Sequence, residues 1–233
     1  IKHRQYKTHD LLNYYEQSGP DYEHWSKAFN MHFGYYQPRM NPFNREQLLD
    51  NMNRQVITEL GDCYSSNPLL VDMGCGLGAT LRSIRNELPN TLLKGVTIVP
   101  WQVDKARQLN AKSKKHDIEI IQSDYCDTPF AGNSVHQVIA IESSCHARGA
   151  SKATLLKEIH RILKRAYHTL CESWVIEQLG NIVEVEKTLR SLGFQQIKAR
   201  DISWNVAPSV AHVPWTVITF LLKELFANGL KLN

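Results

Sequence analysis

The chain has 233 residues, of which 42% are hydrophobic, and a formal net charge of +4 whose basic residues are scattered along the sequence. This length suits one α/β domain with a substantial core, and the mild, dispersed charge argues against nucleic acid as the main partner. The five cysteines are odd in number and form no C-x-x-C pair, so we expect a reduced, cytoplasmic setting, without a disulfide framework or a metal site. We also expect no signal peptide, and no apolar stretch of the roughly 18–20 residues that span a membrane.

The first 45 residues differ in composition from the rest of the chain. Eight aromatic side chains fall between residues 9 and 40, outside any strand–helix alternation: Tyr14, Tyr15, Tyr22, Trp25, Phe29, Phe33, Tyr35 and Tyr36. We expect residues 1–45 to form a cap or lid on a single domain, whose core then spans residues 46–233. Two roles stay open for this segment: cover for the hydrophobic core, or a lid that contacts ligand.

Helices and strands alternate in the middle of the chain. Residues 44–60 carry an apolar stripe at helical spacing, with Asn44 at its start and Gly61 at its expected end. Apolar runs predict four strands, at 69–72, 92–98, 118–121 and 135–141. Further helices are expected after the first strand, over 101–115, and over the stripe at 155–163. The alternation predicts an α/β fold: a Rossmann-like, doubly wound, mostly parallel sheet with helices on both faces.

The tail predicts three more elements. An apolar stripe from Val183 to Leu192 indicates a helix that ends at Gly193. We expect a strand over residues 194–203, followed by a final amphipathic helix that carries Trp215, Ile218 and Leu222.

A glycine-rich turn follows the first strand. The apolar run ends at Asp72, and three glycines in five residues (Gly74, Gly76 and Gly78) then lead into helix-like sequence. Such glycines allow a sharp turn and the close approach of a ligand, and the helix start adds free N–H groups. A dinucleotide site requires G-x-G-x-x-G and a carboxylate on the next strand, whereas this turn has G-x-G-x-G and that strand lacks the carboxylate. No P-loop sequence occurs, so another nucleotide-type ligand is indicated.

Five stretches together resemble one enzyme family. The glycine turn, D-x-G-C-G-x-G, resembles motif I of the class I S-adenosylmethionine-dependent methyltransferases. The segments G-V-T-I-V-P-W-Q at 95–102 and D-Y-C-D-T-P-F at 124–130 follow the second and third strands. The string I-E-S-S-C-H-A at 141–147 looks like the sterol C-methyltransferases, and M-H-F-G-Y-Y at 31–36 like the tocopherol branch. The chain therefore resembles the tocopherol and sterol C-methyltransferases and their terpene- and alkaloid-methylating relatives over nearly its whole length.

The resemblance implies S-adenosyl-L-methionine as cofactor and assigns residues to it. Asp72 and the backbone at Gly74 and Gly76 would hold the methionine moiety, while Thr97 or Ile98, with Gln102, would bind the ribose. Asp124 would accept a hydrogen bond from the adenine amino group and Tyr125 would flank the ring. The implied cofactor contacts also include Tyr14, Cys75 and Ile141. Two structural roles stay open, Thr97 as a residue that ends a strand and Asp124 as a helix cap.

The expected reaction is methyl transfer to a hydrophobic small molecule such as an isoprenoid, sterol or tocopherol-like compound, most favourably at carbon. An alkene that gains a methyl becomes a carbocation, which needs a negative or π-rich surround and then a base. We take Glu142, at the carboxyl end of the fourth strand, as that base or charge stabiliser, assisted by His146 or His32. Binding of the cofactor's amino group stays open for Glu142, and a structural helix-start role stays open for His146.

Two departures from the family pattern stand out. The family usually has S-F-D-x-V before the fourth strand, whereas this chain has S-V-H-Q-V at 134–138, so His136 replaces a structural acid and we expect a local change only. After Lys164, the sequence passes directly to a helix-like Arg165–Leu170 where a fifth strand is expected. About 25 residues are missing by the usual lengths of such elements.

Other functions stay open. Relatives in this family methylate nitrogen or oxygen of alkaloid-like or phenolic acceptors, and cyclopropane-forming enzymes act on lipids at a membrane surface. A degenerate fold that binds isoprenoids or a protein partner is a non-enzymatic alternative, which the intact glycine turn disfavours. We expect no nucleic acid partner, no metal, at most peripheral membrane contact, and leave a homodimer as an open alternative.

Overall fold

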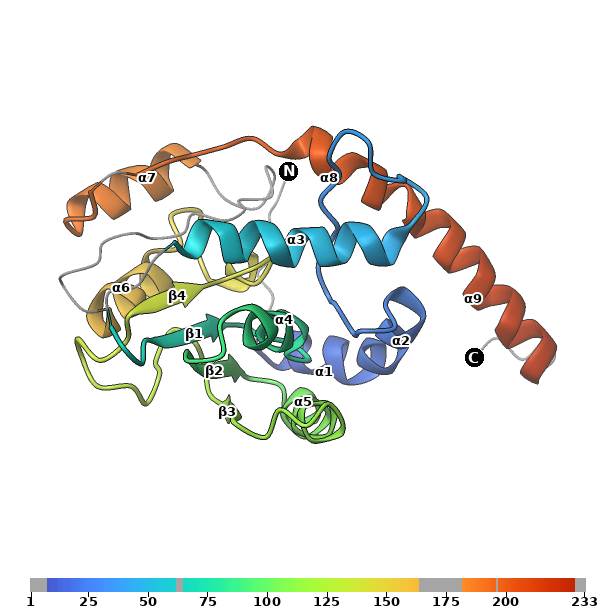
Figure 1. Ribbon diagram of the computed structural model, residues 1–233, viewed down its shortest axis with the longest axis horizontal. Helices are drawn as coiled ribbons and strands as arrows, with labels where there is room; N and C mark the ends of the chain where they lie inside the picture. The colour runs from blue at the N-terminus through green and yellow to red at the C-terminus, as the bar shows by residue number, and fades with distance from the viewer. Residues whose placement is uncertain (1–7, 62–64, 164–181, 196, 229–233) are drawn as a thin grey trace.

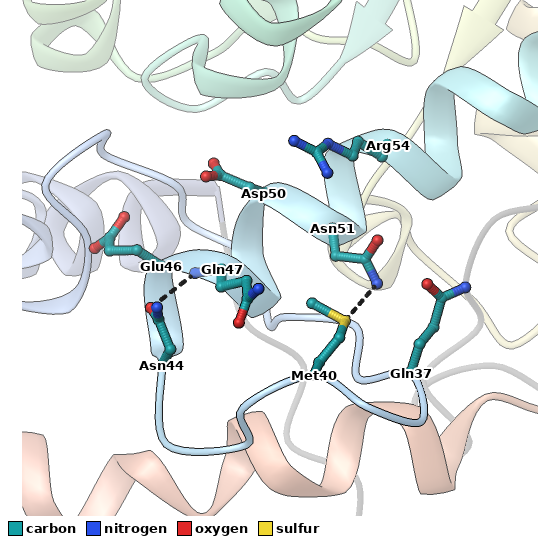
Figure 2. A pocket seen from close by; sticks show the side chains of 8 residues that line it. All are labelled: Gln37, Met40, Asn44, Glu46, Gln47, Asp50, Asn51 and Arg54. Atoms are coloured by element: carbon teal, nitrogen blue, oxygen red, sulfur yellow. Dashed lines mark hydrogen bonds between the residues drawn. The ribbon is translucent and has the colours of Figure 1, made fainter.

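The computed structural model describes residues 8–61, 65–163, 182–195 and 197–228 (Figure 1). Its strands are β1 (Leu69–Met73), β2 (Leu92–Thr97), β3 (Ile118–Gln122) and β4 (Gln137–Ile139). Its helices are α1 (Thr8–Ser18), α2 (Tyr22–Trp25), α3 (Arg45–Leu60), α4 (Ala79–Glu87), α5 (Pro100–Lys112), α6 (Ala153–Ile162), α7 (Ile182–Ser191), α8 (Ser203–Val210) and α9 (His212–Asn228). Short 3₁₀ turns occupy Gly19–Asp21 and Ser144–His146.

The four described strands form one parallel sheet in the order β3-β2-β1-β4. Each described pair is parallel: Leu69 is in register with Leu92 at the start of β1, and Val71 with Val138 on its other side. The strand order reverses direction between β1 and β4, and in doubly wound sheets ligands bind outside the carboxyl ends of the strands at such a point. The glycine turn and Glu142 both follow these strand ends.

Helices cover both faces of the sheet, which confirms the predicted fold class. Leu70 of β1 belongs to a core cluster with residues of α3, α4 and α5, whereas Val71 and Met73 point to the opposite face and pack with α6 and α7. The alternation of side chains along a strand places neighbours on opposite faces, so an apolar run without polar gaps is what a doubly covered strand requires.

The predicted bounds of α3 agree with the structure, whereas α5 ends at Lys112, before the predicted residue 115, and glycines mark two helix ends. Asn44 caps α3, because its side chain accepts a hydrogen bond from the backbone N–H of Gln47. Gly61 ends that helix with φ +61°, and Gly193 follows α7 with φ +88°, both conformations that favour glycine.

Two predicted strands need correction. The described residues at 194–195 and 197–202 are irregular, and α8 begins at Ser203, so the strand expected over 194–203 is wrong. The fourth strand is shorter than expected: ladder pairing with β1 covers Gln137–Ile139, while Val135 forms an isolated parallel bridge with Leu163. His136 takes part in this region through its backbone N–H, which donates to the Leu69 carbonyl, and its Nδ1, which accepts from the Leu69 N–H. The sequence break predicted at Lys164–Arg165 lies outside the described residues.

The tail also corrects the expectation about apolar stretches. In the described part of the chain, Ser203–Lys223 is one stretch long and apolar enough to cross a membrane by length and composition alone. One such stretch is weak evidence by itself, since helices of many non-membrane proteins pass the same test. What distinguishes this stretch is that only 6% of it is buried.

Candidate active site

The glycine turn lies at the carboxyl end of β1 and depends on glycine for its shape. Gly74, Gly76 and Gly78 have φ of +89°, +52° and +73°. A Cβ on Gly74 would lie 2.4 Å from the Cβ of Ser143, and one on Gly76 would lie 2.7 Å from the sulfur of Met31. The backbone N–H groups of Gly74 and Cys75 donate to the Val96 carbonyl at 2.8 and 3.0 Å, which ties the turn to β2. The turn is therefore held in place by hydrogen bonds, and its glycine backbone packs directly against Ser143 and Met31.

Asp72 is the most unusual polar residue of the site. Its side chain is 3% exposed, and its Oδ1 has no hydrogen-bond partner among the described residues. Burial raises the pKa of this carboxyl from 3.8 to about 7. A buried acceptor without a partner is costly in a folded protein and therefore points to a ligand that supplies a donor or a positive charge.

The polar pair predicted at the end of β2 is present. Thr97 and Gln102 are both buried, and the Thr97 hydroxyl donates to Gln102 Oε1 at 2.6 Å. The other end of the amide, Gln102 Nε2, lies 3.9 Å from the sulfur of Met31, a weak acceptor. This N–H is therefore available to a ligand hydroxyl, while Ile98, next along the chain, is half-buried.

The third predicted contact region follows β3. Asp124 is exposed, and its Oδ1 accepts the backbone N–H of Cys126, so it stabilises its own turn. The Tyr125 hydroxyl donates to the Ser143 carbonyl at 3.0 Å, and its ring lies 3.6 Å from the position of a Cβ on Gly74. Burial raises the pKa of Tyr125, so its phenol stays protonated. Tyr125 thereby links the loops that follow β3 and β4 beside the glycine turn.

Glu142 sits on the loop after β4 in a strained conformation, with φ +50°. Its Oε1 accepts the backbone N–H of Phe33 at 2.9 Å, so the aromatic N-terminal segment reaches the end of β4. Burial raises the pKa of Glu142 from 4.5 to about 7, and the Phe33 hydrogen bond opposes this shift. A carboxyl poised near neutrality is suited to accept a proton.

His146 faces the same N-terminal segment. Its Nε2 lies 3.0 Å from the Tyr15 hydroxyl, and the two rings meet edge to face at 5.7 Å. Partial burial, and then the Lys152 ammonium, lower the pKa of His146. The pKa of Tyr15 is raised, by burial first and then by neighbours that include Tyr22 and Glu142. Tyr15 and His146 thus form a contact pair between α1 and the segment that follows Glu142, and the Glu142 charge is the smallest of the influences on the pKa of Tyr15.

His32 is placed away from this group. It is 6% exposed, its Nδ1 lies 2.8 Å from the Phe33 carbonyl, and its Nε2 lies 3.1 Å from Oδ1 of Asn53. Asn53 in turn bonds Thr80 and Asn30. Both ring nitrogens of His32 are therefore engaged in a buried network that joins the N-terminal segment to α3 and α4.

The remaining residues predicted to contact the cofactor lie at the edge of the candidate site. Cys75 points its thiol toward β2, where a Cβ on Gly95 would lie 2.6 Å from its sulfur, so its backbone and not its side chain borders the site. Ile141 is buried in the core cluster on the α3–α5 face. Tyr14 is 57% exposed and its ring contacts that of Tyr15 at 5.1 Å.

Sequence reasoning missed Met31 and Ser143 as site residues. Met31 lies over Gly76 and Gln102, and the Ser143 hydroxyl donates to the Met73 carbonyl beside Gly74. Both adjoin residues that were singled out, His32 and Glu142, but nothing in the pattern shows that they face the turn. Among the described residues, no cluster of three or more histidine, cysteine or acidic side chains is arranged to hold a metal.

The known proteins to which this chain is similar include methyltransferases. The model of a family described as a methyltransferase domain matches residues 70–166, from β1 to just beyond α6. The 24-methylenesterol C-methyltransferase 2 of Arabidopsis thaliana is 23% identical over 222 residues, which cover 84% of this chain and 59% of that protein. The chloroplastic tocopherol O-methyltransferase of the same plant is 26% identical over 255 positions, covering 94% of this chain and 72% of that protein.

Two solved structures share the fold. Geranyl diphosphate C-methyltransferase of Streptomyces coelicolor, in complex with S-adenosyl-L-homocysteine, matches with a TM-score of 0.71 at 16% identity, covering 86% of this chain and 84% of that one. The cyclopropane synthase MmaA2 of Mycobacterium tuberculosis matches with a TM-score of 0.72 at 13% identity, covering 95% and 86%.

Residues 70–166 therefore match a methyltransferase domain, and the chain has the fold of these methyltransferase structures.

The chain spans only part of the length of the first of these relatives. It covers 59% of the length of the Arabidopsis sterol enzyme and 38% of sterol methyltransferase-like 3 of Botryococcus braunii. The alignment with tocopherol O-methyltransferase runs over 255 positions, more than the 233 residues of the chain, so that relative contains residues without a counterpart here.

The residues present fit S-adenosylmethionine. The cofactor carries a positively charged sulfonium, an ammonium and a ribose with two hydroxyls. Asp72 offers a buried carboxylate oxygen without a partner, Gly74 and Gly76 offer a tight turn without side chains, and Gln102 offers an amide N–H. These three features follow the ends of β1 and β2, where nucleotides bind in doubly wound sheets.

Proposed function

We propose that this methyltransferase transfers a methyl group from S-adenosyl-L-methionine to a hydrophobic small molecule of isoprenoid, sterol or tocopherol type, at carbon. The observation that carries the cofactor assignment is the buried Asp72 carboxylate with its partnerless Oδ1 beneath the glycine turn. A bound cation beside it would satisfy that oxygen. The relatives named as sterol, tocopherol and geranyl diphosphate methyltransferases support the acceptor class.

The cofactor, when bound, supplies a methyl group that is already activated by the sulfonium. The tasks of the protein are therefore alignment of the acceptor and exclusion of water. The contacts of Phe33 with Glu142 and of Tyr15 with His146 support a position of the N-terminal segment beside the carboxyl end of β4. This segment would shield the reaction and supply aromatic faces beside a developing positive charge.

Proton removal falls to Glu142 in this proposal. An alkene carbon that forms a bond to the methyl leaves a cation on its neighbour, and loss of a proton restores the double bond. The Glu142 carboxylate would accept that proton, and His146, held by Tyr15, would pass it toward solvent. Tyr14, Thr97, Ile98, Asp124, Tyr125 and Ile141 keep their proposed cofactor contacts, whereas the network around His32 favours a structural role for that residue.

Methylation of a phenolic oxygen is a second candidate. The relative with 94% coverage of this chain is a tocopherol O-methyltransferase. A base whose pKa lies about 7, as for Glu142, also suits removal of a phenolic proton. Cytoplasmic location and the lack of a nucleic acid partner remain predictions, and a homodimer remains an open alternative.

Calorimetric titration with S-adenosylmethionine and S-adenosylhomocysteine tests the proposal first, with Asp72→Asn as the matched variant. We expect micromolar binding to the wild-type chain and at least tenfold weaker binding to the variant. Labelled-methyl assays with prenyl, sterol, phenolic and amine acceptors then identify the methylated atom by mass spectrometry. Absence of binding to a folded wild-type chain would contradict the cofactor assignment, and exclusive labelling of oxygen or nitrogen would contradict methylation at carbon.

A further inference from the structure

Helices α8 and α9 have their polar side chains turned inward. Asn205, Ser209, His212, Thr216 and Thr219 recur at spacings of four and three residues, so they share one helical stripe. This stripe faces the rest of the domain: Asn205 Nδ2 donates to the Tyr36 carbonyl at 2.9 Å, and the Ser209 hydroxyl accepts the Gly34 N–H at 2.7 Å.

The same inward pattern continues along α9. His212 Nε2 lies 2.8 Å from the Pro42 carbonyl, and an Arg45 guanidinium N–H donates to the Thr216 hydroxyl. The ring of Phe220 meets that of His24 at 5.6 Å. The polar stripe of α8 and α9 is thus used to attach the two helices to the domain.

The opposite side of these helices is apolar and exposed. Trp204 is 89% exposed and Trp215 is 66% exposed, and the outward side also carries Val217, Ile218 and Leu222. We call the exposed apolar residues between 204 and 222 the outer face. Figure 1 shows α8 and α9 along the outside of the domain, with the far part of α9 projecting past α2. A contiguous exposed apolar surface of this kind marks an interaction site.

We propose that the outer face docks on the surface of a lipid bilayer. No charged residue occurs between Ser203 and Leu222. At 100° per residue, the exposed apolar side chains cover an arc of roughly 200°, wider than the stripe that one partner helix covers. The apolar interior of a bilayer can cover the whole of this arc. Exposed tryptophans are also typical of helices that lie in the membrane interface. The hydrogen bonds of the inward stripe keep the helices on the domain, so they lie on the membrane and do not cross it.

The docked position has a consequence for the site, which rests on the proposed function. Phe33 donates its N–H to Glu142, and the next residue, Gly34, donates to Ser209 of α8. Two adjacent residues therefore connect Glu142 to α8, a helix that would lie at the membrane surface. A hydrophobic acceptor dissolved in the membrane would reach the candidate site without crossing water.

Flotation with vesicles of neutral phosphatidylcholine tests the proposal. We expect the wild-type chain to float with the vesicles. The triple variant Trp215→Ser, Ile218→Ser, Leu222→Ser should have a vesicle–water partition coefficient at least about tenfold lower, because each change removes several carbons from the lipid-facing side. Val183→Ser on α7 is the matched control, since Val183 is an exposed apolar residue (69%) on another helix. Circular dichroism and cofactor titration establish that the variants are folded.

Three outcomes overturn the proposal: a wild-type chain that stays with the soluble fraction, a triple variant that floats as well as the wild type, or light scattering that shows a wild-type dimer converted to a monomer by the triple variant. The last outcome would assign the outer face to a second copy. Because flotation requires neither cofactor nor turnover, it separates failure of the docking proposal from failure of the proposed function.

Discussion

Replacing Asp72 by asparagine isolates the energetic cost of the buried carboxylate. Asparagine keeps the size of the side chain and removes the charge. The pKa of Asp72 is raised from 3.8 to about 7 by burial in the cofactor-free protein. Because the folded pKa is the higher one, the folded state holds the proton more tightly, and the stabilisation is present in full below 3.8 and is lost as the pH rises to about 7.

The expected size follows from the shift. About three pKa units at about 1.4 kcal/mol each give about 4 kcal/mol as the upper bound for the loss of stability of the wild-type chain. Asparagine does not titrate, so the Asp72→Asn variant does not lose this stability as the pH rises. We therefore expect the variant to be more stable than the cofactor-free wild type above pH 7, by about 2 to 4 kcal/mol.

Urea unfolding between about pH 5 and pH 8, without cofactor, measures this difference. With saturating S-adenosylmethionine the advantage of the variant should shrink, since ligand at about 100 times its Kd adds about 2.7 kcal/mol to the wild type and less to the variant, which binds it more weakly. Calorimetry at about pH 6.5 in two buffers should also detect proton release on binding, because a cation beside Asp72 lowers its pKa. Equal pH dependence of the two chains would refute the assignment of a desolvated, partnerless carboxylate.

Three further substitutions test the rest of the site. Glu142→Gln should lower kcat by about 100-fold or more with little change in cofactor Kd, and the wild-type rate should rise with pH through about 7 as the carboxylate forms; equal losses of kcat and affinity would contradict a base role. Tyr15→Phe removes the hydroxyl next to His146, so kcat should fall by about tenfold and the pH profile of kcat should shift. The free energy of unfolding should change by at most about 1.5 kcal/mol. An unchanged pH profile would show that the contact has only a structural role. Gly74→Ala should abolish cofactor binding and cost about 2 kcal/mol or more beyond Gly193→Ala, which has nearly the same φ but open space around its Cβ; similar unfolding free energies of the two variants would refute the clash.

Much of the fold followed from local pattern. Asn44 and Gly61 bounded α3 because a side-chain cap and a left-handed glycine act within a few residues of the helix end. The apolar runs gave four parallel strands because a strand covered on both faces has no polar side. The strand expected at 194–203 failed because its apolar residues, such as Phe194, pack against α6 and α7, while no described strand pairs with residues 194–195 or 197–202.

The candidate site was predicted in part. Asp72, Thr97 and Gln102 were found because they stand at strand ends next to the glycine turn, and the sheet topology brings such ends together. His32 was misleading because its neighbours in sequence point to the candidate site while its ring turns into the Asn53 network. Met31 was missed because its contact with Gly76 joins segments 45 residues apart, and only the path of the N-terminal segment creates it.

The sequence by itself determined the domain type, since glycine spacing and apolar periodicity are local properties that admit few backbone conformations. Only the tertiary structure decided which side of each element meets which neighbour. In α8 and α9 the sequence shows an apolar and a polar side, and the usual expectation places the polar side in water. The structure reverses this, because backbone groups at Gly34, Tyr36 and Pro42 need hydrogen-bond partners that the polar stripe provides. Satisfying those groups leaves the apolar side outward, and the position of the outer face follows from that requirement.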